Sequence, residues 1–201
     1  MLPHVNRKPL LIVLSGPSGV GKDAILNRMR ILEMPLHFTV TTTTRPIRAN
    51  EREGVDYNFI SEVSFQSFIK EGEFLEFAEV YGNWYGVPKS QVRSALSAGS
   101  DVLIKTDVQG AATIKRLVPQ ATMIFVVPPS LPELERRLTW RMTESDESLR
   151  LRLETARSEM EHASTFDYVV TNDTLEDAVR EMDCIITAEH CRIPPRVAQL
   201  D

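Results

Sequence analysis

The segment LLIVLSGPSGVGKD, residues 10–23, carries the clearest evidence about the fold of this chain. It begins with a short apolar run, which is typical of a strand buried on both faces of a sheet. Gly16–Lys22 then follows the pattern G-x-x-x-x-G-K, and a helical spacing of apolar residues begins at Ala24. A strand, a glycine-rich loop and a helix in this order are the context in which the pattern forms a phosphate-binding loop.

The predicted loop would hold the phosphates of ATP. Its glycines let the backbone curl so that N–H groups point at phosphate oxygens, and the helix that follows favours an anion at its N-terminus. The alternative interpretation is a glycine-rich turn that binds no phosphate, and the lysine at the correct spacing argues against it. The predicted ATP-binding residues of this segment are Gly16, Pro17, Ser18, Gly19, Val20, Gly21, Lys22 and Asp23.

Asp23 departs from the motif, which has Ser or Thr after the lysine to bind Mg²⁺ through its hydroxyl. A carboxylate is also a hard magnesium ligand, so Asp23 is a candidate metal ligand. Its charge would, however, repel a neighbouring polyphosphate. The alternative is an acidic residue in the first turn of a helix, where the dipole favours it.

The rest of the chain alternates strand-like and helix-like segments, which predicts an α/β protein with a parallel sheet flanked by helices. Further strands are expected at residues 102–104, 123–127 and 168–170, and helices at 24–32, 90–98, 111–117, 131–141, 148–162 and 175–188. Residues 39–85 break the alternation and are interpreted as a small mixed insertion. The arginine-rich residues 136–152 are interpreted as a mobile helical flap.

Composition narrows the class of protein. The chain has 201 residues, a net charge of -5 and two cysteines, which fits one domain without a disulfide framework. A negative net charge argues against a general nucleic-acid or membrane-surface binder. No apolar run is long enough to span a membrane, so the cytoplasm is the default expectation. Residues 193–201 are expected to be a loose extension.

A second polar cluster lies in the insertion. Arg45 and Arg48 are three residues apart among threonines, a pattern that suits one phosphate group held by guanidinium forks and hydroxyls. Glu76 lies among aromatic residues, where a carboxylate could accept from two N–H donors such as those of guanine. Taken singly, each feature is also typical of an ordinary surface.

Together, the blocks make the sequence resemble the guanylate kinase family along nearly its whole length. The resemblance rests on GPSGVGK (16–22), TTRPIR (43–48), GVDYNF (54–59), GEFLEFAEV (72–80), GNWYG (82–86), DVQG (107–110) and VVTND (169–173). It implies the reaction ATP + GMP → ADP + GDP with Mg²⁺, on a P-loop NTPase-type fold. It also implies a core (1–39, 91–132, 163–201), a GMP-binding insertion (40–90) and a helical lid (133–162).

The resemblance also implies residue roles. Arg45, Arg48, Tyr57 and Tyr85 would hold the GMP phosphate, and Glu76, Thr41 and Asp107 would lie at the guanine. Asp107 is, with Asp23, a tentative metal ligand. Arg137, Arg141 and Arg152 would join Lys22 and Arg45 in neutralising the transferred phosphate, and Asn172 would line the adenine pocket.

Four further positions depart from the family pattern: Val87, Lys105, Trp140 and Met142. Val87 replaces a small hydroxyl residue, Lys105 an acidic one, and the other two replace glycines. Two alternatives therefore stay open. Kinases of ribose bisphosphate share a loop ending in Lys-Asp, and guanylate kinase-like modules of scaffold proteins bind phosphopeptides without catalysis. The oligomeric state is left open.

Overall fold

The computed structural model describes residues 7–49, 51–80, 82–139, 146–198 and 200. Side chains are described for the same residues except 146–152. Among the departures named above, Trp140 and Met142 lie outside the described residues, as does Arg141.

A parallel sheet forms the centre of the molecule. In the described part of the chain it has five strands, in the order β2-β7-β1-β8-β9. These are β1 (Leu11–Ser15), β2 (Leu36–Phe38), β7 (Asp101–Lys105), β8 (Thr122–Val127) and β9 (Tyr168–Thr171). Val13 of β1 lies opposite Ile104 on one side and Met123 on the other. The predicted parallel α/β sheet is confirmed, with β2 as an additional edge strand.

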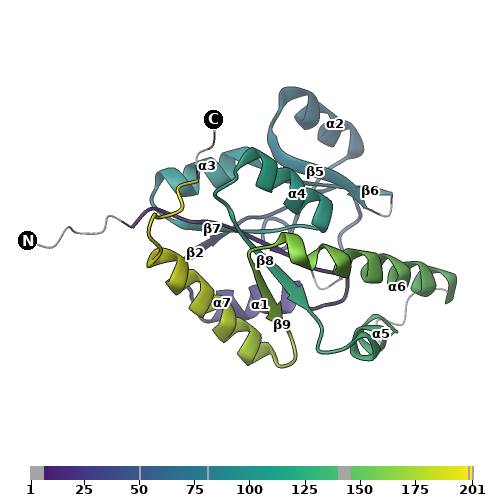
Figure 1. Ribbon diagram of the computed structural model, residues 1–201. Coiled ribbons are helices and arrows are strands. Elements are labelled where there is room, and N and C mark those ends of the chain that lie inside the picture. The colour runs from purple at the N-terminus through teal and green to yellow at the C-terminus, as the bar shows by residue number, and fades with distance from the viewer. Residues whose placement is uncertain (1–6, 50, 81, 140–145, 199, 201) are drawn as a thin grey trace, which may run out of the picture.

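Helices cover both faces of this sheet (Figure 1). The helices α1 (Lys22–Ile31) and α7 (Leu175–His190) pack on the face formed by Ile12 and Leu14. The helices α3 (Lys89–Ser97) and α4 (Val108–Leu117) pack on the opposite face, formed by Leu11 and Val13. All four of these β1 residues are buried, as expected for a central parallel strand.

A second sheet lies beside the first and falls within the predicted insertion. It contains β3 (Thr42–Thr43), β4 (Asn58–Phe59), β5 (Phe74–Val80) and β6 (Asn83–Pro88), in the order β4-β3-β6-β5. Helix α2 (Glu62–Glu71), which the sequence reading did not identify, begins after the capping residue Ser61. Its buried Phe65 stacks on Phe74, with the ring centroids 4.5 Å apart.

Two further helices cover the expected lid, and the first of them begins two residues before it. They are α5 (Leu131–Thr139) and α6 (Asp146–Glu161), followed by a short 3-10 helix, His162–Thr165. Leu134, Leu138 and Ala156 form a small core between α5 and α6. The boundaries of the core, insertion and lid stay predictions. They are defined by parts that move relative to one another, and one structure does not show such movement.

The C-terminal segment is not the loose extension that its two prolines suggested. The guanidinium of Arg196 donates to the Ala121 carbonyl at 3.1 Å and pairs with Asp167 at 3.0 Å. Ala198 and Leu200 pack against the core beneath α3 and α4.

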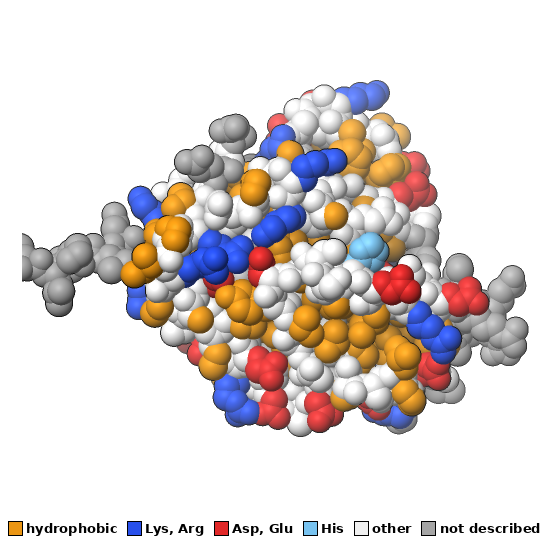
Figure 2. Space-filling view, viewed as in Figure 1, with side chains coloured by type: hydrophobic (Ala, Val, Ile, Leu, Met, Phe, Trp, Pro, Cys, Tyr) orange, Lys and Arg blue, Asp and Glu red, His pale blue; other side chains and the backbone are white. Residues whose placement is uncertain are grey.

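Figure 2 shows acidic and basic side chains interspersed over one face of the molecule. None of the described helices is long and apolar enough to cross a bilayer.

Candidate functional site

A cavity of about 460 Å³ lies between the two sheets, at the carboxyl end of the parallel strands. This is the edge at which open α/β sheets bind their ligands. The cavity is lined by residues of the glycine-rich loop, the second sheet, the β7–α4 junction and helix α6. It therefore brings together segments that are up to about 140 residues apart, from Gly16 to Glu159.

The glycine-rich loop forms one wall and has the geometry expected of a phosphate cradle. Gly21 has φ of +99°, and a Cβ there would lie 2.3 Å from the Asn172 amide nitrogen. The Lys22 ammonium donates to the Gly16 and Pro17 carbonyls at 2.5 and 3.1 Å. Burial lowers the pKa of Lys22, with the nearby Glu159 carboxylate acting in the opposite direction. The loop is thus closed around its own lysine.

Helix α6 reaches this loop through Glu159. The Ser18 backbone N–H donates to the Glu159 carboxylate at 3.2 Å, so a carboxylate occupies one of the loop's anion-binding donors. Burial raises the pKa of Glu159, and the charge of Lys22 partly opposes that shift. Sequence reasoning did not select Glu159, because only the packing of α6 brings it to the loop.

Two predicted ATP-site residues lie behind the loop. The Asn172 amide donates to the Val20 carbonyl at 2.7 Å and is buried. The Arg137 guanidinium donates to the Asn172 carbonyl at 3.0 Å and to Glu133 at 2.7 Å. Neither side chain lines the cavity described above. Their contacts with adenine and with phosphate stay predictions, and the geometry assigns both a role in supporting the loop.

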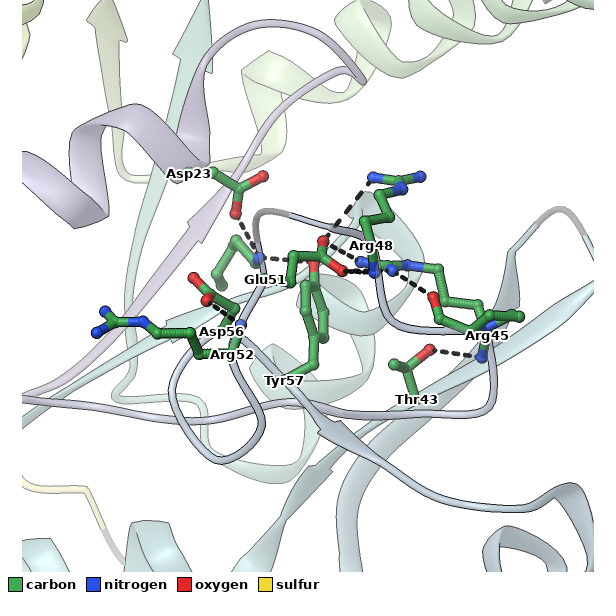
Figure 3. A network of polar contacts seen from close by, with 10 residues as sticks. Asp23, Thr43, Arg45, Arg48, Glu51, Arg52, Asp56 and Tyr57 are labelled. Carbon is green, nitrogen blue, oxygen red and sulfur yellow. Dashed lines mark hydrogen bonds and ion pairs between the residues drawn. The ribbon is translucent and has the colours of Figure 1, made fainter. Parts of the chain in front are cut away.

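The opposite wall carries the predicted acceptor-phosphate residues Arg45, Arg48, Tyr57 and Tyr85. Arg45 is 8% exposed, and its guanidinium forms a forked pair with Glu51 at 2.5 and 2.7 Å. The Glu51 hydrogen bond holds the pKa of Arg45 above its ordinary value. In Figure 3 the Tyr57 ring lies between Asp23 and the two arginines. Glu51, missed by sequence reasoning, fixes the orientation of Arg45.

Glu76 lies at the floor of the cavity and is 4% exposed. One carboxylate oxygen accepts from the Thr106 hydroxyl at 2.9 Å, and the other has no hydrogen-bond partner among the described residues. Burial raises the pKa of Glu76 to about 7, and the charge of Asp107 adds to this. A buried carboxylate oxygen without a protein partner can accept from a ligand, as from an N–H group of guanine.

The remaining predicted guanine-site residues are Thr41 and Asp107, which both line the cavity. One Asp107 oxygen caps helix α4 by accepting from the Gly110 N–H at 2.7 Å. Val87, in contrast, is fully buried in the core beneath α3 and α4 and does not line the cavity. The valine that replaces the hydroxyl residue therefore packs in the hydrophobic core.

Asp23 and Lys105, two of the departures from the family pattern, contact each other. The Lys105 ammonium lies 2.5 Å from a carboxylate oxygen of Asp23 and 2.8 Å from the Tyr57 hydroxyl. Burial alone would lower the pKa of Lys105, but Asp23 and Tyr57 outweigh burial and raise it. The two residues are 82 positions apart in the chain, so no local sequence pattern links them.

The described residues contain no group of three or more His, Cys, Asp or Glu side chains that could hold a metal by themselves. Mg²⁺ with a nucleotide usually needs only one or two carboxylates, since phosphates and water complete its shell. Asp107 and Asp23 both line the cavity near the glycine-rich loop, so the oxygen donors fit such a site. Of the predicted arginines, Arg141 and the side chain of Arg152 lie outside what the structure describes.

The fold and the site together define a P-loop kinase: a phosphate cradle on a parallel sheet, facing a second, arginine-containing phosphate site. A family model described as guanylate kinase matches residues 7–189. The guanylate kinase of Myxococcus xanthus is 49% identical over 91% of this chain and 88% of its own length. That of Thermus thermophilus is 48% identical over 90% and 82%.

A solved structure, the guanylate kinase of Anaplasma phagocytophilum, aligns with a TM-score of 0.76 and 32% identity, over 92% of this chain and 88% of that one. The chain belongs to the guanylate kinase family. The resemblance inferred from the sequence blocks is thereby confirmed, as is the P-loop NTPase-type fold.

Proposed function

We propose that this chain transfers the γ-phosphate of ATP to GMP, giving ADP and GDP. The observation that carries the proposal is the unpartnered oxygen of the buried Glu76, on the cavity that the glycine-rich loop also lines. Adenine presents an acceptor at N1 where guanine presents a donor. A site with a buried carboxylate acceptor thus selects guanine, and such sites reject the wrong ligand by roughly 10⁴.

The acceptor phosphate would lie between Arg45, Arg48, Tyr57 and Tyr85. Arg45 is preorganised, since Glu51 holds its guanidinium and the Tyr57 ring lies 4.8 Å from it. Arg48 is 63% exposed and can move toward the ligand. One fixed and one mobile guanidinium suit a substrate that must enter before the site closes.

Phosphoryl transfer needs alignment and charge neutralisation rather than covalent help from the protein. The GMP phosphate is itself an anionic nucleophile, so no separate general base is required. Lys22 would release the Gly16 and Pro17 carbonyls and turn to the ATP phosphates. Arg137, Arg141 and Arg152 would add positive charge when the lid closes, which would also exclude water from the reaction.

Mg²⁺ would accompany ATP, with Asp107 and Asp23 as its protein ligands, directly or through water. Bound there, it would neutralise charge on the phosphate oxygens. The Asp23→Asn variant tests the Asp23 assignment. We expect its Mg²⁺ requirement for turnover to rise severalfold, and an unchanged requirement would remove Asp23 from the metal site.

The test of the function is a coupled ADP-release assay with GMP, AMP, CMP, UMP and ribose 1,5-bisphosphate as acceptors. We expect turnover with GMP alone. Glu76→Gln should lower kcat/KM for GMP by about 100-fold, because an amide donor then faces the guanine donors. Glu73→Gln, on an exposed residue directly before β5 and three positions before Glu76, is the matched control and should leave turnover unchanged.

The comparisons favour the kinase over both alternatives. An intact loop with Lys22 distinguishes the chain from binding modules that have lost the loop, and a buried guanine-type acceptor has no use with a sugar phosphate. Turnover of ribose bisphosphate but not GMP would contradict the proposal. ATP binding without any transfer to GMP would contradict it in the other direction.

A further inference from the structure

The Lys105 side chain ends between the two phosphate sites. Lys105 is the last residue of β7, so it lies at the carboxyl edge of the parallel sheet, and its side chain is 15% exposed. It lines the same cavity as the glycine-rich loop on one side and Arg45 and Tyr57 on the other. A lysine this enclosed needs polar partners, because an unpaired buried charge is costly.

The partners of Lys105 come from both walls of the cavity. Asp23, which accepts at 2.5 Å, belongs to the first turn of α1, directly after the glycine-rich loop. Tyr57, which accepts at 2.8 Å, lies directly before β4 of the second sheet. The ammonium also lies 4.5 Å from the Tyr57 ring centroid. Figure 3 shows Asp23 on the side of the tyrosine away from Arg45 and Arg48.

The bonding capacity of the ammonium is not exhausted by these partners. A lysine carries three N–H donors, and Asp23 and Tyr57 take two of them within the described structure. The third donor remains for a ligand in the cavity. Asp23 is 64% exposed, so it holds Lys105 from the solvent side without burying a second charge.

The charged residues that line the cavity also distinguish Lys105 from the other cations there. The cavity lining contains the carboxylates of Asp23, Glu76, Glu79, Asp107 and Glu159. The lining cations are Lys22, Arg45, Arg48 and Lys105. Lys22 bonds to its own loop and Arg45 is paired with Glu51. Lys105 is thus the lining cation that contacts both a donor-side residue and an acceptor-side residue.

We propose that Lys105 is a ligand of the acceptor phosphate, held in position by Asp23 and acting together with Tyr57. The phosphate would then contact arginines on one side and this lysine on the other. The proposal rests on the proposed GMP-binding function and adds a residue to it. It also accounts for the coincidence of the two departures, since a carboxylate at position 23 neutralises and orients the lysine at position 105.

The test measures binding by calorimetry in buffer containing EDTA, so that neither turnover nor a metal ion enters the result. GMP, guanosine and ADP are titrated into the wild type, Lys105→Met and the matched control Lys70→Met, whose lysine is exposed on α2. We expect Lys105→Met to weaken GMP binding by about 10-fold or more, the loss of one charge-assisted hydrogen bond. Guanosine and ADP binding should change less than about threefold, which is within the scatter of one weak contact.

Three results would overturn the proposal. GMP binding that is unchanged in Lys105→Met would show no phosphate contact. An equal loss for guanosine would show a structural role, and a loss for ADP alone would assign Lys105 to the donor side. If Lys105→Met does not fold, as judged by thermal unfolding, Lys105→Gln gives the same three comparisons with an uncharged donor retained.

The double variant Asp23→Asn/Lys105→Met tests whether Lys105 binds the phosphate or only neutralises the charge of Asp23. In Lys105→Met the charge of Asp23 is no longer offset by the lysine and repels the phosphate, so replacing Asp23 by Asn should recover part of the GMP affinity. Full recovery to the wild-type value would mean that Lys105 only neutralises Asp23, and the proposal would fail. A wild type that neither binds nor phosphorylates GMP would instead refute the proposed function, so the two failures are distinguishable.

Discussion

Glu76 illustrates how one buried carboxylate can set the pH behaviour of the whole site. Its pKa of about 7 in the ligand-free protein means that it is largely protonated in mild acid. A protonated carboxyl cannot accept from two guanine N–H groups at once. Guanine bound at Glu76 as proposed would therefore displace a proton whenever the pH lies below this pKa.

We predict that guanosine affinity falls about tenfold for each pH unit below about 7 and is constant above it. Guanosine is the better ligand for this measurement, because the phosphate of GMP itself titrates near pH 6. Calorimetric titrations between about pH 5 and about pH 8.5 would test it. Glu76→Gln should bind weakly and without this pH dependence, whereas a flat wild-type profile would contradict the raised pKa.

At the scale of single elements, the N-terminus of α4 shows how backbone geometry serves the site. Gly110 lies in the first turn of α4, where a Cβ would be 2.1 Å from the Thr106 hydroxyl and 2.6 Å from the unpartnered Glu76 oxygen. Any side chain at this position would therefore force the Thr106 and Glu76 side chains to shift. The glycine of the DVQG block thus positions a side chain that is 34 residues earlier in the chain.

The Gly110→Ala variant should consequently displace Glu76 and weaken GMP binding by about 10-fold or more, the cost of one misplaced charged hydrogen bond. ADP binding should be nearly unchanged, since the glycine-rich loop lies on another wall of the cavity. Alanine raises helix propensity by about 1 kcal/mol relative to glycine, so a loss of affinity cannot be assigned to a weakened helix. Equal losses for both nucleotides would argue for general disruption of α4.

Helix α7 is joined to the sheet and the C-terminal segment by one buried carboxylate. Glu189 is 2% exposed, accepts from the Tyr168 hydroxyl at 2.5 Å and pairs with Arg196 at 2.9 Å. Glu189→Gln should lower the free energy of unfolding by about 2 kcal/mol, since Arg196 keeps its second partner, Asp167. Urea unfolding would measure this, with Glu181→Gln on the exposed side of the same helix as the control.

At the scale of the whole molecule, Glu159 links the lid region to the phosphate loop. Its carboxylate occupies the Ser18 N–H where a nucleotide phosphate would bind. We therefore predict that ATP displaces Glu159, which would couple nucleotide binding to the position of α6.

We predict that Glu159→Gln tightens ADP binding severalfold, because an uncharged amide competes less well for the loop and no longer repels the phosphates. Fluorescence or calorimetric titration in buffer without metal would measure the effect. Glu161→Gln, at an exposed position two residues later, is the matched control. Weaker ADP binding in Glu159→Gln would show that the carboxylate supports the loop instead of competing with the ligand.

The sheet, the phosphate loop and the family could be predicted from local sequence patterns. A buried strand, glycines at fixed spacing and a following helix are read within a few residues, and the acceptor residues come in contiguous blocks. The strand β2 and the helix α2 were missed because a three-residue edge strand and a helix with one buried side chain carry little periodic signal.

The tertiary structure decided how residues distant in sequence are paired. Only the parallel register of β1 and β7 brings Asp23 to Lys105, and only the packing of α6 brings Glu159 to Ser18. The fold also placed Val87 in the core and Asn172 behind the loop. Contacts of this kind depend on which strand ends meet at one edge of the sheet, and no local pattern of residues contains that information.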